Sequence, residues 1–190
     1  MPHKRSIYIT LLCTFHWLLL ACGSMTIKDA STQAYIPIQG WTLELHQDVV
    51  IPSGRARVFF QEGRLVYAVN EYKPHCQLTV RALSEQPQDV HAGRFAIDRV
   101  FGTTDEFVSS DRILLAAAGD TVVTDGGDGG GERFLIFLYH MALHDDKQPH
   151  VTHLVCGGAA EMPFLARYPT LQDIHASLGN YATLILPEGG

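Results

Sequence analysis

The most apolar stretch in the body of this 190-residue chain reads Phe134-Leu135-Ile136-Phe137-Leu138-Tyr139-His140-Met141-Ala142-Leu143. Apolar residues occupy both sets of alternate positions, so neither face of an extended segment here is polar. A strand that is covered on both faces has this pattern. The run is too short for a membrane-spanning helix, which needs about 20 apolar residues. We therefore predict a buried strand whose second face meets a helix, a loop or a partner.

Further strands are predicted on both sides of this stretch. Alternating apolar and polar residues indicate strands over the ranges 41–51, 55–61, 64–69, 76–82, 94–101, 151–156 and 181–186. Glu62-Gly63 is a tight connection that predicts a hairpin of the second and third ranges. The alternation slips near Arg99, which indicates a β-bulge. The glycine-rich run 125–132 is predicted to be an exposed hairpin tip.

One helix is predicted late in the chain. Thr170 is a favourable N-cap, and Asp173 stands at the third helical position, where it completes a weak capping box. Gly179 is placed to end the helix. The apolar stripe between them consists of Leu171, Ile174 and Leu178. The fold class is thus mainly β: an antiparallel sandwich or half-open barrel with one short C-terminal helix, which plugs an open end or covers the second face of 134–143.

The N-terminus has the features of an export signal. Lys4 and Arg5 precede a short apolar run, and Leu19-Leu20-Ala21-Cys22 resembles the lipobox of bacterial lipoproteins. The resemblance implies cleavage before Cys22 and acyl chains on that residue, which anchor the protein to a membrane. The alternatives are an ordinary cleaved signal or translation from Met25.

The same resemblance predicts the location. Cys22 is not followed by Asp, which is similar to lipoproteins that are sorted to the outer membrane. The body of the chain, from Trp41 to Leu186, resembles small uncharacterised lipoproteins of Gram-negative bacteria. This resemblance rests on the segment 72–78, Cys156 and the helix at 170–179. We expect a cell-envelope protein of a Gram-negative bacterium, at the outer membrane and facing the periplasm.

The predicted division of the chain has three parts. Residues 1–21 form the lipoprotein signal peptide, residues 22–36 comprise the lipidated Cys22 and a flexible tether, and residues 37–190 form a single β-rich globular domain. Loss of Lys4 and Arg5 with the signal takes the formal net charge from −6 to −8. An acidic surface argues against nucleic acid and against anionic lipid headgroups as partners.

The cysteines fit an exported protein. Cys13 leaves with the signal and Cys22 takes the lipid, which leaves Cys76 and Cys156. Because exported proteins meet an oxidising compartment, we predict a disulfide between these two. Two free thiols or a pair of metal ligands are the alternatives.

Two kinds of ligand site are considered. His140, His144, His150 and His153 would lie near one another if their strands pair, and imidazoles with nearby carboxylates suit Zn or Cu; surface or hydrogen-bonded histidines are the alternative. An apolar cavity in the half-barrel would be lined by Phe59, Phe60, Phe137 and Tyr139, which are otherwise plain core residues.

No catalytic motif and no cofactor motif is found, so the chain is predicted not to be an enzyme. We expect a membrane-anchored lipoprotein with a structural or interaction role, whose partners are the membrane, through Cys22, and another envelope protein or the cell wall. The alternative is an envelope module that binds a small ligand or a metal.

Overall fold

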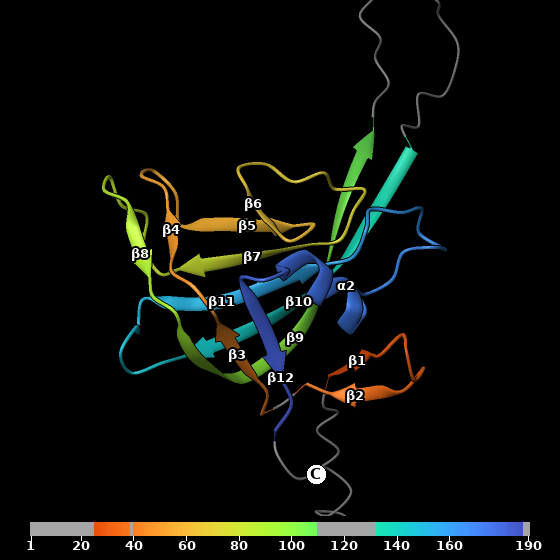
Figure 1. Cartoon of the computed structure of the whole chain (residues 1–190). Helices are drawn as coiled ribbons and strands as arrows, with labels where there is room; N and C mark the ends of the chain where they lie inside the picture. Colours follow the sequence, from red (N-terminus) through yellow and green to blue (C-terminus); the bar gives the residue numbers. More distant parts are fainter. Residues whose placement is uncertain (1–24, 39, 110–131, 188–190) are drawn as a thin grey trace, which may run out of the picture.

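The computed structural model describes residues 25–38, 40–109 and 132–187. Their main feature is an eight-stranded antiparallel sheet in the order β12-β3-β9-β10-β11-β7-β5-β6. Two two-stranded ribbons and the short helix α2 accompany it (Figure 1). The predicted signal peptide, Cys22 and residues 125–131 of the glycine-rich run lie outside the described residues, and Glu132, the last residue of that run, begins β10.

The centre of the sheet is the long hairpin of β9 (Gly93–Ser109) and β10 (Glu132–His144). Its register extends from Glu132 opposite Ser109 to His144 opposite Ala96. The register shifts where Ala142 faces Arg99 and Leu143 faces Ile97, so Asp98 is the extra residue of a bulge. The bulge predicted near Arg99 is thus confirmed. The far end of this hairpin projects beyond the rest of the sheet (Figure 1).

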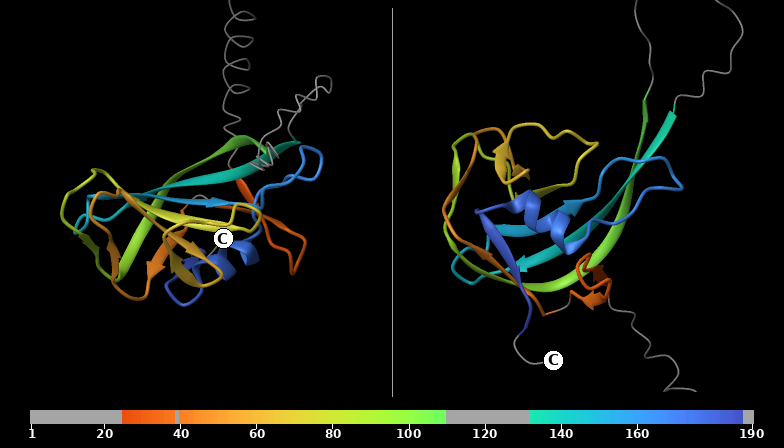
Figure 2. Two further views of the ribbon diagram at one scale, coloured as in Figure 1. Left: turned by 90° about the horizontal axis from the view of Figure 1, so that it is seen from above. Right: turned by 45° about the vertical axis from the view of Figure 1, so that its right-hand side comes forward.

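The sheet continues on both sides of this hairpin. On one side lie β11 (Val151–Gly157), β7 (His75–Val80) and the predicted hairpin of β5 (Arg57–Gln61) with β6 (Arg64–Val66). On the other side lie β3 (Thr42–Leu45) and β12 (Ala182–Ile185). The sheet curls, and α2 lies inside the curl (Figure 2). The architecture is therefore the half-open barrel of the sequence prediction, with one short C-terminal helix.

Helix α2 (Leu171–Leu178) begins and ends as predicted. Thr170 Oγ1 accepts a hydrogen bond from the Asp173 N–H, and the Asp173 carboxylate accepts one from the Thr170 N–H at 2.9 Å, which is a complete capping box. The apolar stripe of the helix is buried in the main core, and the Gly63 N–H in the β5–β6 turn donates to the Ser177 carbonyl at 3.1 Å. The helix contacts β5, β7 and β12, so it fills the space between the two edges of the sheet.

The second face of β10 is covered by a loop. Ile136 and Leu138 pack with Val155 of β11 and with Ala160 in the segment that follows β11. The Glu161 N–H also donates to the Leu135 carbonyl at 3.1 Å, which holds that segment along β10. The apolar stretch predicts that a helix, a loop or a partner covers this face, and the structure shows a loop. None of the helices in the described part of the chain is long and apolar enough to cross a membrane.

The range 41–51 does not form one strand as predicted. It divides into β3 and β4 (Val49–Ile51), and β4 pairs with β8 (Gln88–Val90) in a separate ribbon. The Asp48 carboxylate lies at the division, where it accepts a hydrogen bond from the Ala92 N–H at 2.8 Å. The continuous alternation of the sequence did not reveal this break, because it depends on a contact with a residue far along the chain.

The predicted tether of residues 22–36 is wrong for the residues that the structure describes. β1 (Thr26–Lys28) and β2 (Tyr35–Pro37) form an antiparallel ribbon, and Ile27 and Ile38 are fully buried in the main core. The turn between the two strands is polar, because Asp29 accepts hydrogen bonds from Ser31 and Thr32. A few isolated apolar residues around such a turn give too little periodicity to indicate strands.

Candidate functional site

A groove of about 500 Å³ lies between the β1–β2 ribbon and the segment that leads into α2. Its lining combines aromatic rings with two cationic side chains. These residues are Tyr35, Phe137, Tyr139, Tyr168, Lys28 and Arg167. Pockets for small molecules are lined mainly by apolar and aromatic side chains with a few polar groups, so this groove is the candidate site.

The aromatic rings of the groove are fixed by packing on one side. Tyr168 stacks on Tyr139 with ring centroids 4.6 Å apart, and its ring is tilted on Phe137 at 5.0 Å. The Tyr139 hydroxyl donates a hydrogen bond to the Thr26 carbonyl at 2.8 Å, and burial raises the pKa of Tyr139 to about 12. Tyr139 is therefore a neutral donor that joins β10 to the ribbon. Tyr35, by contrast, is 67 % exposed.

Gly102 makes room for Tyr168, one of the tyrosines that line the groove. A Cβ at this position would overlap the Tyr168 hydroxyl and would lie 3.1 Å from the methyl carbon of Met25. Tyr168 and the first described residue of the chain therefore meet over the backbone of β9. Glycine is required here for close approach, since the side chain of any other residue would displace the ring.

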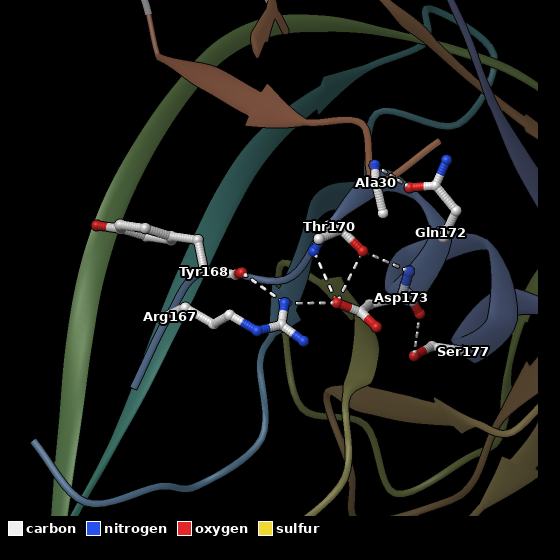
Figure 3. A network of polar contacts seen from close by, with 7 residues as sticks. All are labelled: Ala30, Arg167, Tyr168, Thr170, Gln172, Asp173 and Ser177. Atoms are coloured by element: carbon white, nitrogen blue, oxygen red, sulfur yellow. Dashed lines mark hydrogen bonds and ion pairs between the residues drawn. The ribbon is translucent and has the colours of Figure 1, made fainter. Parts of the chain in front are cut away.

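The ribbon wall of the groove is attached to α2. The Ala30 N–H donates to Gln172 Oε1 at 2.7 Å (Figure 3). The Gln172 amide also donates to Asp29. Hydrogen bonds from Ser31 and Gln172 hold the pKa of Asp29 well below its usual range. The Asp29 carboxylate is therefore ionised at neutral pH, and it helps to hold the turn of the ribbon to the helix.

The two cations of the groove differ in their surroundings. Arg167 Nη1 is 3.0 Å from the Asp173 carboxylate, and Figure 3 shows the guanidinium turned toward that carboxylate while the Tyr168 ring points toward the long strands. The other nitrogen atoms of the guanidinium are donors that a ligand can use. Lys28 has no carboxylate within ion-pair distance among the described residues. The groove thus offers donors to an anion beside aromatic surface.

The cavity predicted from four aromatic residues is not formed as such. Phe137 and Tyr139 line the groove, but Phe60 is 1 % exposed in the main core, and Phe59 lines a separate hollow of about 110 Å³. Sequence reasoning missed Tyr35 and Tyr168. Tyr35 lies in the range assigned to the tether, and Tyr168 stands in no periodic segment, so neither carried a pattern that pointed to the site.

A second, polar basin of about 320 Å³ lies on the other face of the sheet from α2, and His75, Thr103, Asp105 and His140 are among its lining residues. His140 Nε2 is 2.8 Å from Thr103 Oγ1, and the imidazole stacks on Phe101 with ring centroids 4.8 Å apart. Burial lowers the pKa of His140, and burial likewise lowers the pKa of His75. Both rings are therefore neutral at pH 7.

The four candidate metal-binding histidines are not brought together. His140 and His153 lie on the adjacent strands β10 and β11, but His144 faces Asp146 at 3.3 Å, and His150 Nε2 is 3.3 Å from the Asp89 carbonyl. No group of three or more potential metal ligands occurs in residues 25–38, 40–109 and 132–187. Strand pairing places His140 and His153 near each other, whereas the turn directs the other two elsewhere.

Cys76 and Cys156 occupy facing positions on β7 and β11. Their sulfur atoms are 2.10 Å apart, and both residues are fully buried in the main core. The predicted pairing of these cysteines is confirmed by this geometry.

Comparison of the chain with models of protein families, with curated proteins and with solved structures finds no match.

Proposed function

We propose that this chain is a lipid-anchored protein of the Gram-negative cell envelope, held by Cys22 at the outer membrane, and that its domain acts by binding and not by catalysis. The observation that carries the proposal is the buried Cys76–Cys156 pair. A disulfide in the core fits a domain that folds in an oxidising compartment. The lipobox-like Leu19–Cys22 supplies the route to that compartment and the attachment there.

The anchor is tested by intact-mass analysis of the full chain expressed in a Gram-negative host. The expected product lacks residues 1–21 and carries acyl chains on Cys22. The matched control, Cys22→Ser, should lose the acyl chains, because the hydroxyl is a poorer nucleophile than the thiol. An unacylated product that retains its first 21 residues and has titratable thiols at Cys76 and Cys156 would contradict the proposal.

An exposed apolar surface supports the interaction role. Tyr72, Phe107 and Phe134 form a cluster of rings, in which Phe134 lies 5.5 Å from each of the other two centroids. The segment after β11 adjoins this cluster through the bond from the Ala160 N–H to the Glu71 carbonyl, and there Phe164 is 79 % exposed and Leu165 is 55 % exposed. Exposed apolar patches mark interaction sites, and an apolar segment of an envelope protein is the partner that this surface fits.

This surface is tested with a photo-crosslinking amino acid in place of Phe164. We expect one reproducible crosslinked envelope protein. The matched control is the same substitution at Tyr67, which is 74 % exposed on another part of the domain. Equal crosslinking from both positions, or none from Phe164, would count against a partner at this surface.

The groove favours a second candidate function, the binding of a small ligand. Its volume of about 500 Å³ lies in the range of small-molecule sites, and its aromatic rings and two cations suit an anionic group with an apolar neighbour. Native mass spectrometry of the purified protein tests this function. A stoichiometric bound molecule that is lost on Tyr168→Ala supports it, and a protein that carries no such molecule argues against it.

A further inference from the structure

We propose that the groove binds the phosphate headgroup of a membrane phospholipid, so that the domain lies directly against the membrane to which Cys22 is anchored. The inference rests on the proposed lipid anchor, and it adds an orientation and a ligand class to it. The β1–β2 ribbon is its starting point. Because this part of the chain is folded, it is not the flexible tether that would have separated the domain from the lipid.

The length of chain between the anchor and the domain is short. Only Gly23 and Ser24 separate Cys22 from Met25, and an extended chain spans at most about 3.6 Å per residue, which gives about 10 Å. Met25 is already part of the fold, because its carbonyl accepts a hydrogen bond from the Ile38 N–H at 3.1 Å. The attachment point of the domain is therefore within about 10 Å of the acylated residue.

That attachment point lies beside the groove. The methyl group of Met25 and the Tyr168 ring meet over Gly102, and Thr26, the next residue, accepts the hydrogen bond of Tyr139. Two of the aromatic rings of the groove thus lie next to the point where the chain enters the fold. The membrane surface that holds Cys22 must then be close to the groove.

The lining of the groove fits a membrane–water interface. Lys28 and the free donors of Arg167 can bind a phosphate, and Tyr35 presents a half-apolar ring that is 67 % exposed. Tyrosine is enriched at the level of lipid headgroups, because its ring is apolar and its hydroxyl is polar. A soluble anion shares the phosphate chemistry, but only the membrane is brought to the groove by the chain itself.

Weak contacts are sufficient for this arrangement. One cation at an anionic membrane surface increases binding by about fivefold, so Lys28 and Arg167 alone would hold a free domain poorly. The anchor makes the second contact intramolecular, and short linkers give effective concentrations in the millimolar range or above. The acidic net charge of the chain opposes adsorption in general, and it therefore favours one orientation in which the two cations face the lipid.

The test uses the mature acylated protein in vesicles of phosphatidylethanolamine and phosphatidylglycerol with brominated acyl chains, which quench nearby tryptophan. Tyr35→Trp reports on the groove, and Tyr67→Trp is the matched control at another exposed tyrosine. Trp41 is buried, and the unsubstituted protein supplies its background. We expect the Tyr35→Trp variant to be quenched and its emission shifted to shorter wavelength, with the control unchanged. A second substitution in the Tyr35→Trp variant, Lys28→Gln, should lower the ratio of lipid-bound to unbound groove about fivefold. Lys147→Gln should leave that ratio unchanged.

Each other outcome overturns the inference in a distinguishable way. An acylated protein in which both tryptophan variants are equally quenched, or neither is, refutes the orientation and leaves the anchor intact. An emission shift of the Tyr35→Trp variant on addition of glycerol phosphate in detergent, with none in vesicles, assigns the groove to a soluble ligand. A mass that shows no acyl chain on Cys22 refutes the anchor and the membrane-bound groove together.

Discussion

Cys76 and Cys156 join the adjacent strands β7 and β11 at facing positions of the sheet. The bond closes a loop with a sequence separation of 80 residues, and the chain-entropy estimate for such a loop is about 4.5 kcal/mol. We expect the double variant Cys76→Ala with Cys156→Ala to lose about 2–5 kcal/mol of unfolding free energy in urea. The double replacement avoids a single buried free thiol.

Reduction provides the control for that measurement. Dithiothreitol should lower the unfolding free energy of the unsubstituted protein by a similar amount and should leave the double variant unchanged. A double variant as stable as the unsubstituted protein would show that the two cysteines pack only as small apolar residues.

Three histidines make the stability of the domain depend on pH. Burial lowers the pKa of His75, His140 and His175 below the ordinary value of 6.5. These imidazoles bind protons more readily in the unfolded chain than in the folded domain. The unfolding free energy should therefore fall as the pH drops through 6.5. The urea midpoint at pH 5.5 should therefore lie below that at pH 7.5, and His75→Gln with His175→Gln should reduce the difference.

One histidine acts in the opposite direction. The hydrogen bond to Asp48 raises the pKa of His91, so its contribution is fully present below pH 6.5 and is lost as the pH rises through the folded-state value. Both side chains of that pair are more than 60 % exposed, so solvent screens the contribution, and buried His75 with the half-buried His140 and His175 should dominate.

At the level of single elements, β9 positions the groove through Gly102. Gly102→Ala should force Tyr168 off the strand and cost about 1–3 kcal/mol, the usual penalty for overpacking. Gly93→Ala in the same strand is the matched control, because its Cβ would make only ordinary contacts, with the Gln148 side chain at 3.6 Å and the His91 carbonyl at 3.9 Å. Urea unfolding measures both variants, and equal stability of the two would show that the Tyr168 ring can leave Gly102 without loss.

Elements with local determinants were predictable, and those with distant determinants were not. Helix α2 was found because Thr170, Asp173 and its apolar stripe lie within one short range. The β4–β8 ribbon was missed because the break between β3 and β4 carries no local signal, and Asp48 in that break contacts Ala92, a residue far along the chain. The groove was half predicted for the same reason: Phe137 and Tyr139 belong to the most apolar strand, whereas Tyr35 and Tyr168 are brought to it only by the fold.

At the level of the whole molecule, the decisive question is where the domain begins. Ile27 is fully buried in the same core as Trp41 and Leu184, so residues 25–38 belong to the domain. Ile27→Ala should then cost about 2–5 kcal/mol of unfolding free energy, as truncations of buried isoleucine do. A residue in a flexible tether would change stability by no more than about 0.5 kcal/mol.

The control for this prediction is Tyr35→Ala in the same ribbon, which should be close to neutral because Tyr35 is 67 % exposed. Urea unfolding at neutral pH distinguishes the two cases. If Ile27→Ala proved as mild as Tyr35→Ala, the ribbon would not be part of the core, and the short distance between Cys22 and the groove would no longer hold. If Ile27→Ala lowers the unfolding free energy and Tyr35→Ala does not, residues 25–38 are part of the folded domain and not a flexible tether. An acylated Cys22 must then hold the groove near the lipid.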